Sequence, residues 1–190
     1  GLVISPVVGL FIAFVFQRVT ALLLRNSTFR VNRGLKKGQW LVTGLLAFSH
    51  GANDTQKVIA LVLLSLAAYQ GQELAATVPL WLKLTGGVII FIGILSGGWK
   101  IMKTLGNGIF SLRPLHSLNS QLAAGFSLLA ATMSGMPVST THVVAGAIIG
   151  VGAADEYRMV NWNVGKVMAV AWCITIPASA LVAAIVYAVL

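Results

Sequence analysis

Five apolar runs divide the chain, at about residues 2–24, 39–69, 79–102, 121–154 and 164–190. A helix that crosses the hydrocarbon core of a membrane needs about 20 predominantly apolar residues. The first, third and fifth runs have that length with modest tilt, so each predicts one transmembrane helix. The second and fourth runs are too long for one straight crossing.

Polar residues interrupt both long runs near the middle. The second run is broken at 50–57, His-Gly-Ala-Asn-Asp-Thr-Gln-Lys, and the fourth at 134–142, Ser-Gly-Met-Pro-Val-Ser-Thr-Thr-His. The breaks predict two pairs of half-length helices, 39–49 with 58–69 and 121–133 with 142–154. Since a helix of about ten residues covers about 15 Å, each pair either spans once with an unwound centre or returns as a re-entrant hairpin.

The basic residues favour broken spans over hairpins. They gather in loop 25–38 and beside the third run, as Arg25, Arg30, Arg33, Lys36, Lys37, Lys100, Lys103 and Arg113. Positive residues favour the cytoplasmic side of a membrane. Five crossings place loops 25–38 and 103–120 together inside, whereas two hairpins would put their basic groups on opposite sides.

Composition agrees with an all-α, polytopic membrane protein. Of 190 residues, 57% are hydrophobic and only 9% are charged, against about 25% charged in soluble domains. The net charge of +9 does not indicate nucleic acid, because the basic residues sit beside apolar runs without interleaved aromatic residues. We therefore treat residues 1–190 as a single transmembrane domain.

The first break offers ligands for a cation. Asp54 is the only acid within the apolar runs, and a charge at that depth is costly unless it has a function. Its carboxylate and the Asn53 amide oxygen suit Na⁺, or Asp54 can carry a proton. Gly51 lets backbone approach a bound group, Gln56 extends the polar surface, and Lys57 can attract an anion. The simpler alternative is that Asp54 and Lys57 merely pair one helical turn apart.

The second break offers donors for an anion. Pro137 stops a helix, and Ser139, Thr140 and Thr141 then place three hydroxyl groups at the start of the next one. The free N–H groups and partial positive charge of a helix N-terminus suit a tetrahedral oxyanion such as phosphate or sulfate. The simpler alternative is that one hydroxyl only caps the helix.

The two breaks together predict cation-coupled uptake. An oxyanion near Asp54 is repelled in a site of low dielectric constant, and a sodium ion or proton between them removes that conflict. Secondary transporters place substrates near the membrane midplane, on discontinuous helices.

At these residues the chain resembles the PiT family of inorganic phosphate transporters. Residues 51–54 are similar to its Gly-Ala-Asn-Asp motif, and residues 137–142 to its Pro-Val-Ser-Thr-Thr-His motif. The resemblance implies a multi-pass protein of the inner (plasma) membrane, built of two inverted-topology halves, in which this chain is the C-terminal half. The N-terminal half of the transporter and a second copy in a homodimer would be its partners, and no cofactor is implied.

The resemblance also implies roles for the site residues. Phosphate would contact Asn53, Asp54, Ser139, Thr140 and Thr141, and the coupling Na⁺ or H⁺ would sit near Asn53, Asp54 and Thr141. Residues 55–57, Thr-Gln-Lys, depart from the usual motif. They resemble bacterial members, which include proton-coupled carriers of metal–phosphate complexes.

Two alternatives remain at this level. One is a sulfate permease of the same family. The other is a haem- or metal-binding membrane subunit that uses His50 and His142, although neither has a second histidine at the usual i,i+4 spacing. An enzyme is not expected, since no Gly-x-Ser-x-Gly element or paired carboxylates occur within the apolar runs.

Overall fold

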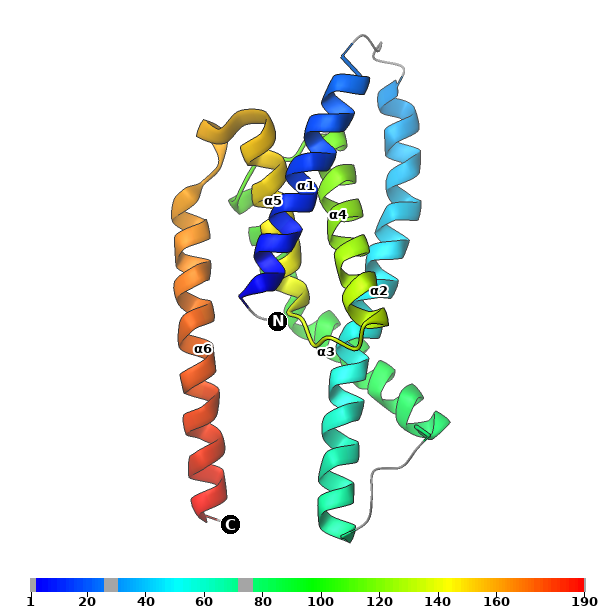
Figure 1. The fold of residues 1–190 in the computed structure, drawn as a ribbon, viewed down its shortest axis with the longest axis vertical. Helices are drawn as coiled ribbons and strands as arrows, with labels where there is room; N and C mark the ends of the chain where they lie inside the picture. The colour runs from blue at the N-terminus through cyan, green and yellow to red at the C-terminus, as the bar shows by residue number, and fades with distance from the viewer. Residues whose placement is uncertain (1–2, 26–30, 72–76, 190) are drawn as a thin grey trace.

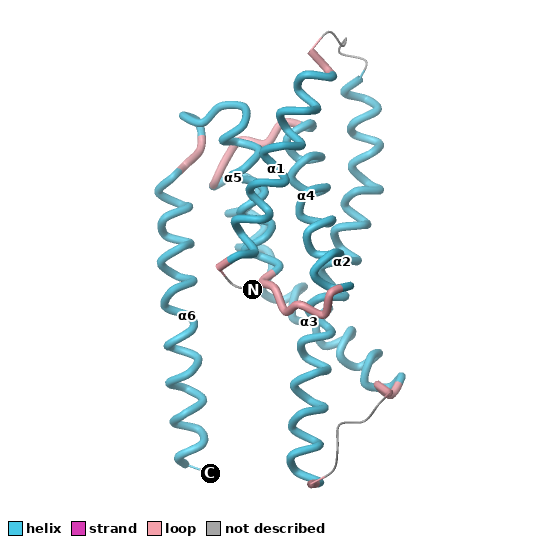
Figure 2. The backbone as a smooth tube through the Cα atoms, in the orientation of Figure 1, coloured by secondary structure: helices cyan, strands magenta, loops and turns pink. Residues whose placement is uncertain are grey.

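The computed structural model describes residues 3–25, 31–71 and 77–189, and every regular element in these ranges is helical. The elements are α1 (Ile4–Leu23), α2 (Val31–Gln70), α3 (Leu80–Lys103), the π-helical turn η1 (Thr104–Gly108), α4 (Pro114–Met133), α5 (Thr140–Glu156), the 3₁₀ turn η2 (Tyr157–Met159) and α6 (Trp162–Val189) (Figures 1 and 2). The all-α prediction is therefore confirmed.

Three of the described helices are long and apolar enough to cross a membrane. They are α1, α3 and α6, over Ile4–Leu23, Leu80–Trp99 and Trp162–Ala188. These helices correspond to the first, third and fifth apolar runs of the sequence.

The structure of the second apolar run differs from the sequence prediction. α2 is one continuous helix of 40 residues, so the predicted division into 39–49 and 58–69 is wrong. The interruption at 50–57 contains no proline, and its side chains find partners on other elements, so the helical ladder persists. Residues 31–38 of the predicted loop 25–38 also belong to α2, and residues 26–30 lie outside the described ranges.

The fourth run forms a helical hairpin, the arrangement that the charge distribution disfavoured. At the end of α4, Met136 N–H donates to the Ala131 carbonyl and Gly135 N–H to the Thr132 carbonyl, while Gly135 has a φ of +65°. This pair of bonds is a Schellman cap, which needs a residue in the left-handed region. The chain then reverses, and α5 runs back along α4 (Figure 1).

Charged and polar residues close the open end of this hairpin, which we call the hairpin mouth and define by Arg113, His116, Asp155 and Glu156. His116 Nε2 lies 2.9 Å from Asp155 Oδ2, and Arg113 Nη2 lies 3.4 Å from Glu156 Oε1. The start of α4 and the end of α5 are thereby joined. α4 therefore begins on the side where α5 ends, as in a re-entrant hairpin.

α1 packs against the hairpin at very short range. A Cβ atom built on Gly146 would overlap the Pro6 carbonyl, and one on Gly150 would overlap the Leu10 carbonyl. The core beside this crossing consists mainly of small residues, namely Ala13, Ala123, Ala124, Leu128, Val143, Ala147 and Val151. Small residues let helix backbones approach closely within a membrane, so α1 and the hairpin form one tightly packed body.

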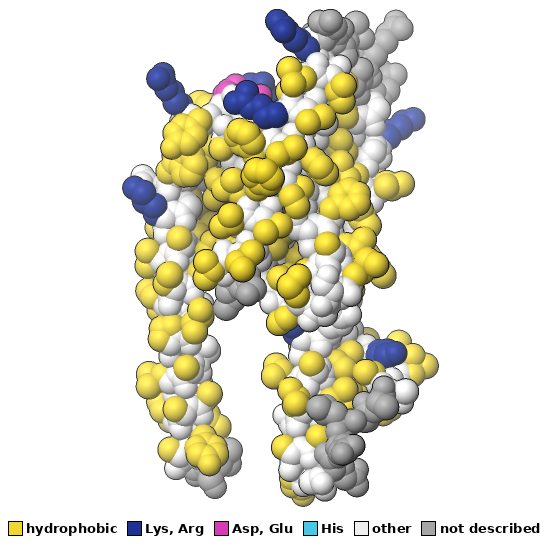
Figure 3. Space-filling model, viewed as in Figure 1, with side chains coloured by type: hydrophobic (Ala, Val, Ile, Leu, Met, Phe, Trp, Pro, Cys, Tyr) yellow, Lys and Arg dark blue, Asp and Glu magenta, His cyan; other side chains and the backbone are white. Residues whose placement is uncertain are grey.

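The remaining helices are less enclosed. α6 and the C-terminal half of α2 extend beyond the bundle as two separate limbs (Figure 1). None of the apolar window of α6 is buried, and hydrophobic side chains are spread along both limbs in Figure 3. Most of the Lys and Arg side chains visible in that view lie toward the end where α1 finishes and α4 begins. The apolar surfaces require lipid or further protein around them.

Candidate functional site

Asp54 is the centre of a polar cluster on α2. Its Oδ2 lies 3.1 Å from His50 Nε2, and its Oδ1 lies 2.8 Å from Lys57 Nζ. Residues 50, 54 and 57 share one face because they are spaced by four and three positions on a helix. The pairing of Asp54 with Lys57 that the sequence left open as the simpler alternative is present.

This cluster also reaches the hairpin. Thr140 Oγ1, in the first turn of α5, donates to Asp54 Oδ2 at 3.4 Å, and Lys57 Nζ donates to the Val138 carbonyl at 2.7 Å. The two polar interruptions, more than 80 positions apart in the chain, are therefore in direct contact.

The start of α5 has the features of an anion site. Ser139 is the N-cap residue, and its hydroxyl accepts a bond from His142 N–H at 3.4 Å. The side chain of Thr140 is buried and directed at Asp54. The first N–H groups of a helix have no partner within it, so this turn presents donors to whatever occupies the adjoining space.

A cavity of about 770 Å³ adjoins these residues, and we call it the polar cavity. Its lining consists of Val3, Ile4, Asp54, Lys57, Pro137, Val138, Ser139 and Thr140. The carboxylate, the ammonium group and the hydroxyls of the two interruptions thus face one shared space. Its volume lies within the range of small-molecule sites.

Asn53, which precedes Asp54 in α2, has one unsatisfied side-chain atom. The side chain is 2% exposed, and its amide nitrogen donates to Thr132 Oγ1 at 3.2 Å. Within the described part of the chain, its amide oxygen is buried and has no hydrogen-bond partner. An unsatisfied buried acceptor costs about 1–3 kcal/mol, so this oxygen is suited to a ligand.

Three other predicted site residues lie elsewhere. Gln56 is exposed and lines a different cavity of about 480 Å³ that also contains Thr55 and Lys83. Gly51 has no neighbour within 4 Å of an added Cβ atom, and Thr141 is half-buried and absent from the described lining of the polar cavity. The helical path of α2 explains the position of Gln56, since two positions rotate a side chain by about 200° from Asp54.

The structure also identifies residues that sequence reasoning missed. Thr132 bonds Asn53, the Val138 carbonyl accepts from Lys57, and Trp172 of α6 stacks on His142. These contacts join distant parts of the chain, so no local sequence pattern could indicate them.

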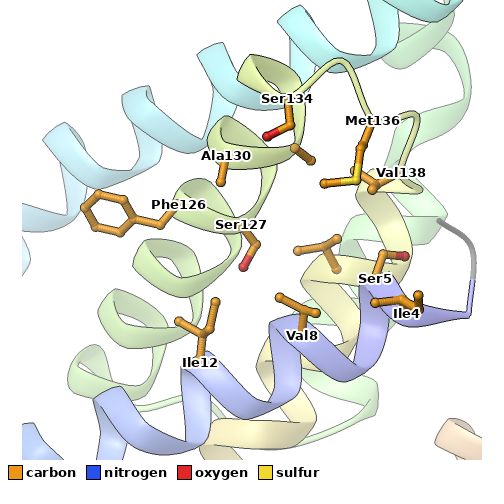
Figure 4. A pocket seen from close by; sticks show the side chains of 12 residues that line it. Ile4, Ser5, Val8, Ile12, Phe126, Ser127, Ala130, Ser134, Met136 and Val138 are labelled. Carbon is orange, nitrogen blue, oxygen red and sulfur yellow. The ribbon is translucent and has the colours of Figure 1, made fainter.

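A second, nearly apolar cavity of about 460 Å³ lies between α1 and the end of α4. Figure 4 shows Val8 and Ile12 of α1 facing Phe126, Ser127 and Ala130 of α4 across it. It shares Ile4 and Val138 with the polar cavity. Its described lining has no charged side chain, which fits hydrophobic groups better than ions.

The histidines do not form a ligand pair in one site. His50 bonds Asp54, whereas His142 stacks on Trp172. Among the described residues, no group of three or more His, Cys, Asp or Glu side chains is placed to hold a metal ion. The arrangement gives no support to the haem or metal subunit.

Comparisons with known proteins identify relatives of this chain. Residues 24–183 match the phosphate transporter family. Two relatives described as probable low-affinity inorganic phosphate transporters are 32% identical over all of this chain, in Bacillus subtilis, and 38% identical over 98% of it, in Rhizobium meliloti. The chain spans 57% and 56% of their lengths.

A solved structure is also similar. It is described as the sodium-dependent phosphate transporter, and it superimposes with a TM-score of 0.75 over 92% of this chain and 61% of its own, at 25% identity.

Proposed function

This chain belongs to the phosphate transporter family, and we propose that it binds inorganic phosphate in the polar cavity as part of a secondary transporter coupled to Na⁺ or H⁺. One observation carries the proposal. Asp54 of α2 and the first turn of α5 line the same cavity and are in contact at 3.4 Å.

Phosphate would occupy the polar cavity beside the start of α5. The hydroxyls of Ser139 and Thr140 and the N–H groups of that turn would donate to its oxygens. Lys57, which also lines the cavity, adds the positive charge that a divalent anion needs in a site of low dielectric constant.

The coupling ion would sit between phosphate and the end of α4. The unsatisfied Asn53 oxygen and the Asp54 carboxylate support this position, because hard cations prefer oxygen ligands. Thr141 lies in the same first turn of α5 but outside the lining of the polar cavity, so a contribution from it requires movement of that turn.

The rest of the transporter would cover the exposed limbs. The curated relatives named above are longer than this chain, and α6 shows an unburied apolar surface. We infer that this chain acts as one half of an inverted repeat in the plasma membrane, and that an N-terminal half closes the polar cavity. A homodimer would bury part of the remaining surface.

Uptake by the full-length protein in proteoliposomes tests the proposal. Radiolabelled phosphate and sulfate are supplied separately, with sodium and pH gradients imposed one at a time and empty liposomes as the control. We expect saturable phosphate uptake that unlabelled phosphate inhibits and an equal concentration of sulfate does not. Saturable sulfate uptake that phosphate fails to inhibit would instead identify a sulfate permease.

A further inference from the structure

Lys57 joins the acid of the site to the hairpin turn. Its ammonium nitrogen lies 2.8 Å from Asp54 Oδ1 and donates to the Val138 carbonyl at 2.7 Å. The side chain is about one-third exposed, at 33%, and it lines the polar cavity. Lys57 therefore contacts the carboxylate and also borders the space that would hold an anion.

Both oxygens of the Asp54 carboxylate already have partners. Lys57 occupies Oδ1, while His50 and Thr140 approach Oδ2. A carboxylate offers about four lone-pair sites, so a metal ion that binds this one is left with a single site, on Oδ1. It would also come close to the Lys57 ammonium, and two positive charges repel strongly where the dielectric constant is low.

The ammonium group retains capacity for a third contact. A lysine has three N–H donors, and the described contacts of Lys57 use two, one to Asp54 and one to Val138. The remaining donor is available to an oxyanion in the polar cavity. One positive charge can thus contact both the fixed carboxylate and the bound anion and reduce the repulsion between them.

We propose that Lys57 is a built-in counter-cation, which takes the position beside Asp54 that a sodium ion would otherwise fill. Phosphate binding and uptake at this site then do not require sodium. The inference rests on the proposed function and assigns to Lys57 the choice of coupling ion.

The test compares the ion requirement of variants of the full-length protein. Phosphate uptake is measured in proteoliposomes with sodium or choline outside, at one pH and under the same inward proton gradient. Lys57→Met removes the charge and keeps an unbranched side chain, Lys57→Arg retains the charge, and Lys83→Met removes an exposed lysine from α3 as the matched control.

We expect the wild type, Lys57→Arg and Lys83→Met to take up phosphate equally well in sodium and in choline. Lys57→Met should lose about tenfold or more of its uptake in choline, since it leaves a half-buried carboxylate without its lysine partner. Sodium should restore that uptake, because the vacated position beside Asp54 can then accept the ion.

Two results would overturn the inference. One is a wild type that takes up phosphate only with sodium, and the other is a Lys57→Met variant whose uptake is insensitive to the exchange of sodium for choline. If Lys57→Met does not yield folded protein, two wild-type measurements still test the inference. They are phosphate uptake in sodium against choline, and calorimetric titration of phosphate with and without sodium. Strictly sodium-dependent phosphate uptake would refute this inference and leave the proposed function intact, whereas no phosphate uptake under any gradient would refute both.

Discussion

The imidazole of His142 stacks on the indole of Trp172, with ring centroids 3.9 Å apart and planes inclined by 28°. His142 lies in the first turn of α5, where its N–H donates to the Ser139 cap. Trp172 belongs to α6, a helix with no buried residue in its apolar window. The stack therefore connects the turn that borders the polar cavity to a helix that is otherwise loosely held.

Replacing Trp172 with alanine tests this connection. We expect Trp172→Ala to raise the apparent KM for phosphate uptake roughly two- to tenfold, because an aromatic pair contributes about 0.5–1.5 kcal/mol. Trp172→Phe should restore most of the affinity, and Trp81→Ala, an exposed tryptophan of α3, is the control. Initial uptake rates across phosphate concentrations provide the measurement. A changed maximal rate with an unchanged constant would show that the stack does not position the site.

Asp54→Asn should abolish coupled uptake and leave the fold intact. The amide keeps the shape of the side chain but loses the charge that Lys57 and His50 contact, so we expect a loss of about a hundredfold in rate. The exposed Glu156→Gln serves as the control. Gel filtration establishes folding, and uptake under a cation gradient gives the result. Normal coupled uptake by Asp54→Asn would remove the carboxylate from the mechanism.

The two threonines of α5 should differ in effect. Thr140 is buried and donates to Asp54, whereas Thr141 is absent from the described lining of the polar cavity. We expect Thr140→Ala to raise the apparent phosphate constant about fivefold, as loss of one hydrogen bond of about 1 kcal/mol implies. Thr141→Ala should raise this constant less. The double variant shows whether the effects of the two single substitutions add. Thr85→Ala, on the exposed face of α3, is the control. Equal phosphate constants for the Thr140 variant and the wild type would mean that this hydroxyl only supports the helix.

Gly146→Ala should destabilise the body formed by α1 and the hairpin. The added methyl group would overlap the Pro6 carbonyl, and overpacking of this kind costs about 1–3 kcal/mol. Gly93→Ala is the matched control, because nothing lies within 4 Å of a Cβ atom at that position. We expect a lower thermal unfolding midpoint in detergent for Gly146→Ala only. Equal midpoints for the two variants would show that α1 can move aside.

The hairpin mouth should weaken in acid. His116 Nδ1 accepts the Arg113 N–H while Nε2 faces Asp155, so a proton added to Nδ1 breaks a bond. Burial lowers the pKa of His116, and the nearby Asp155 only partly opposes it. The unfolded chain binds this proton near pH 6.5 and the folded protein at a lower pH.

Unfolding therefore takes up a proton just below about pH 6.5, and the free energy of unfolding falls as the pH decreases through that region. Thermal unfolding midpoints in detergent at about pH 7.5 and about pH 5.5 measure this loss of stability. His116→Gln should show a smaller decline, since glutamine does not titrate. An identical decline in the variant would assign the pH dependence to other groups.

Several parts of this protein follow from local sequence alone. The unbroken apolar runs specify α1, α3 and α6, because about 20 apolar residues suffice for a membrane helix in any context. Gly135 and Pro137 end α4. Glycine readily adopts the left-handed conformation and proline has no N–H group, and both effects are local to the residue. The Ser139 hydroxyl caps the start of α5, because it bonds an N–H group only three positions away.

Tertiary contacts determined the path of α2 and the assembly of the candidate site. The polar residues at 50–57 are compatible with either a helix or an unwound segment, and partners such as Thr132 and Val138 on the hairpin let α2 remain helical. That continuity turns Gln56 away from the site and leaves His50, Asp54 and Lys57 on one face. The reversal of the chain after α4 then brings Thr140 to Asp54. Such pairings depend on atoms far apart in the chain, which no local pattern of residues encodes.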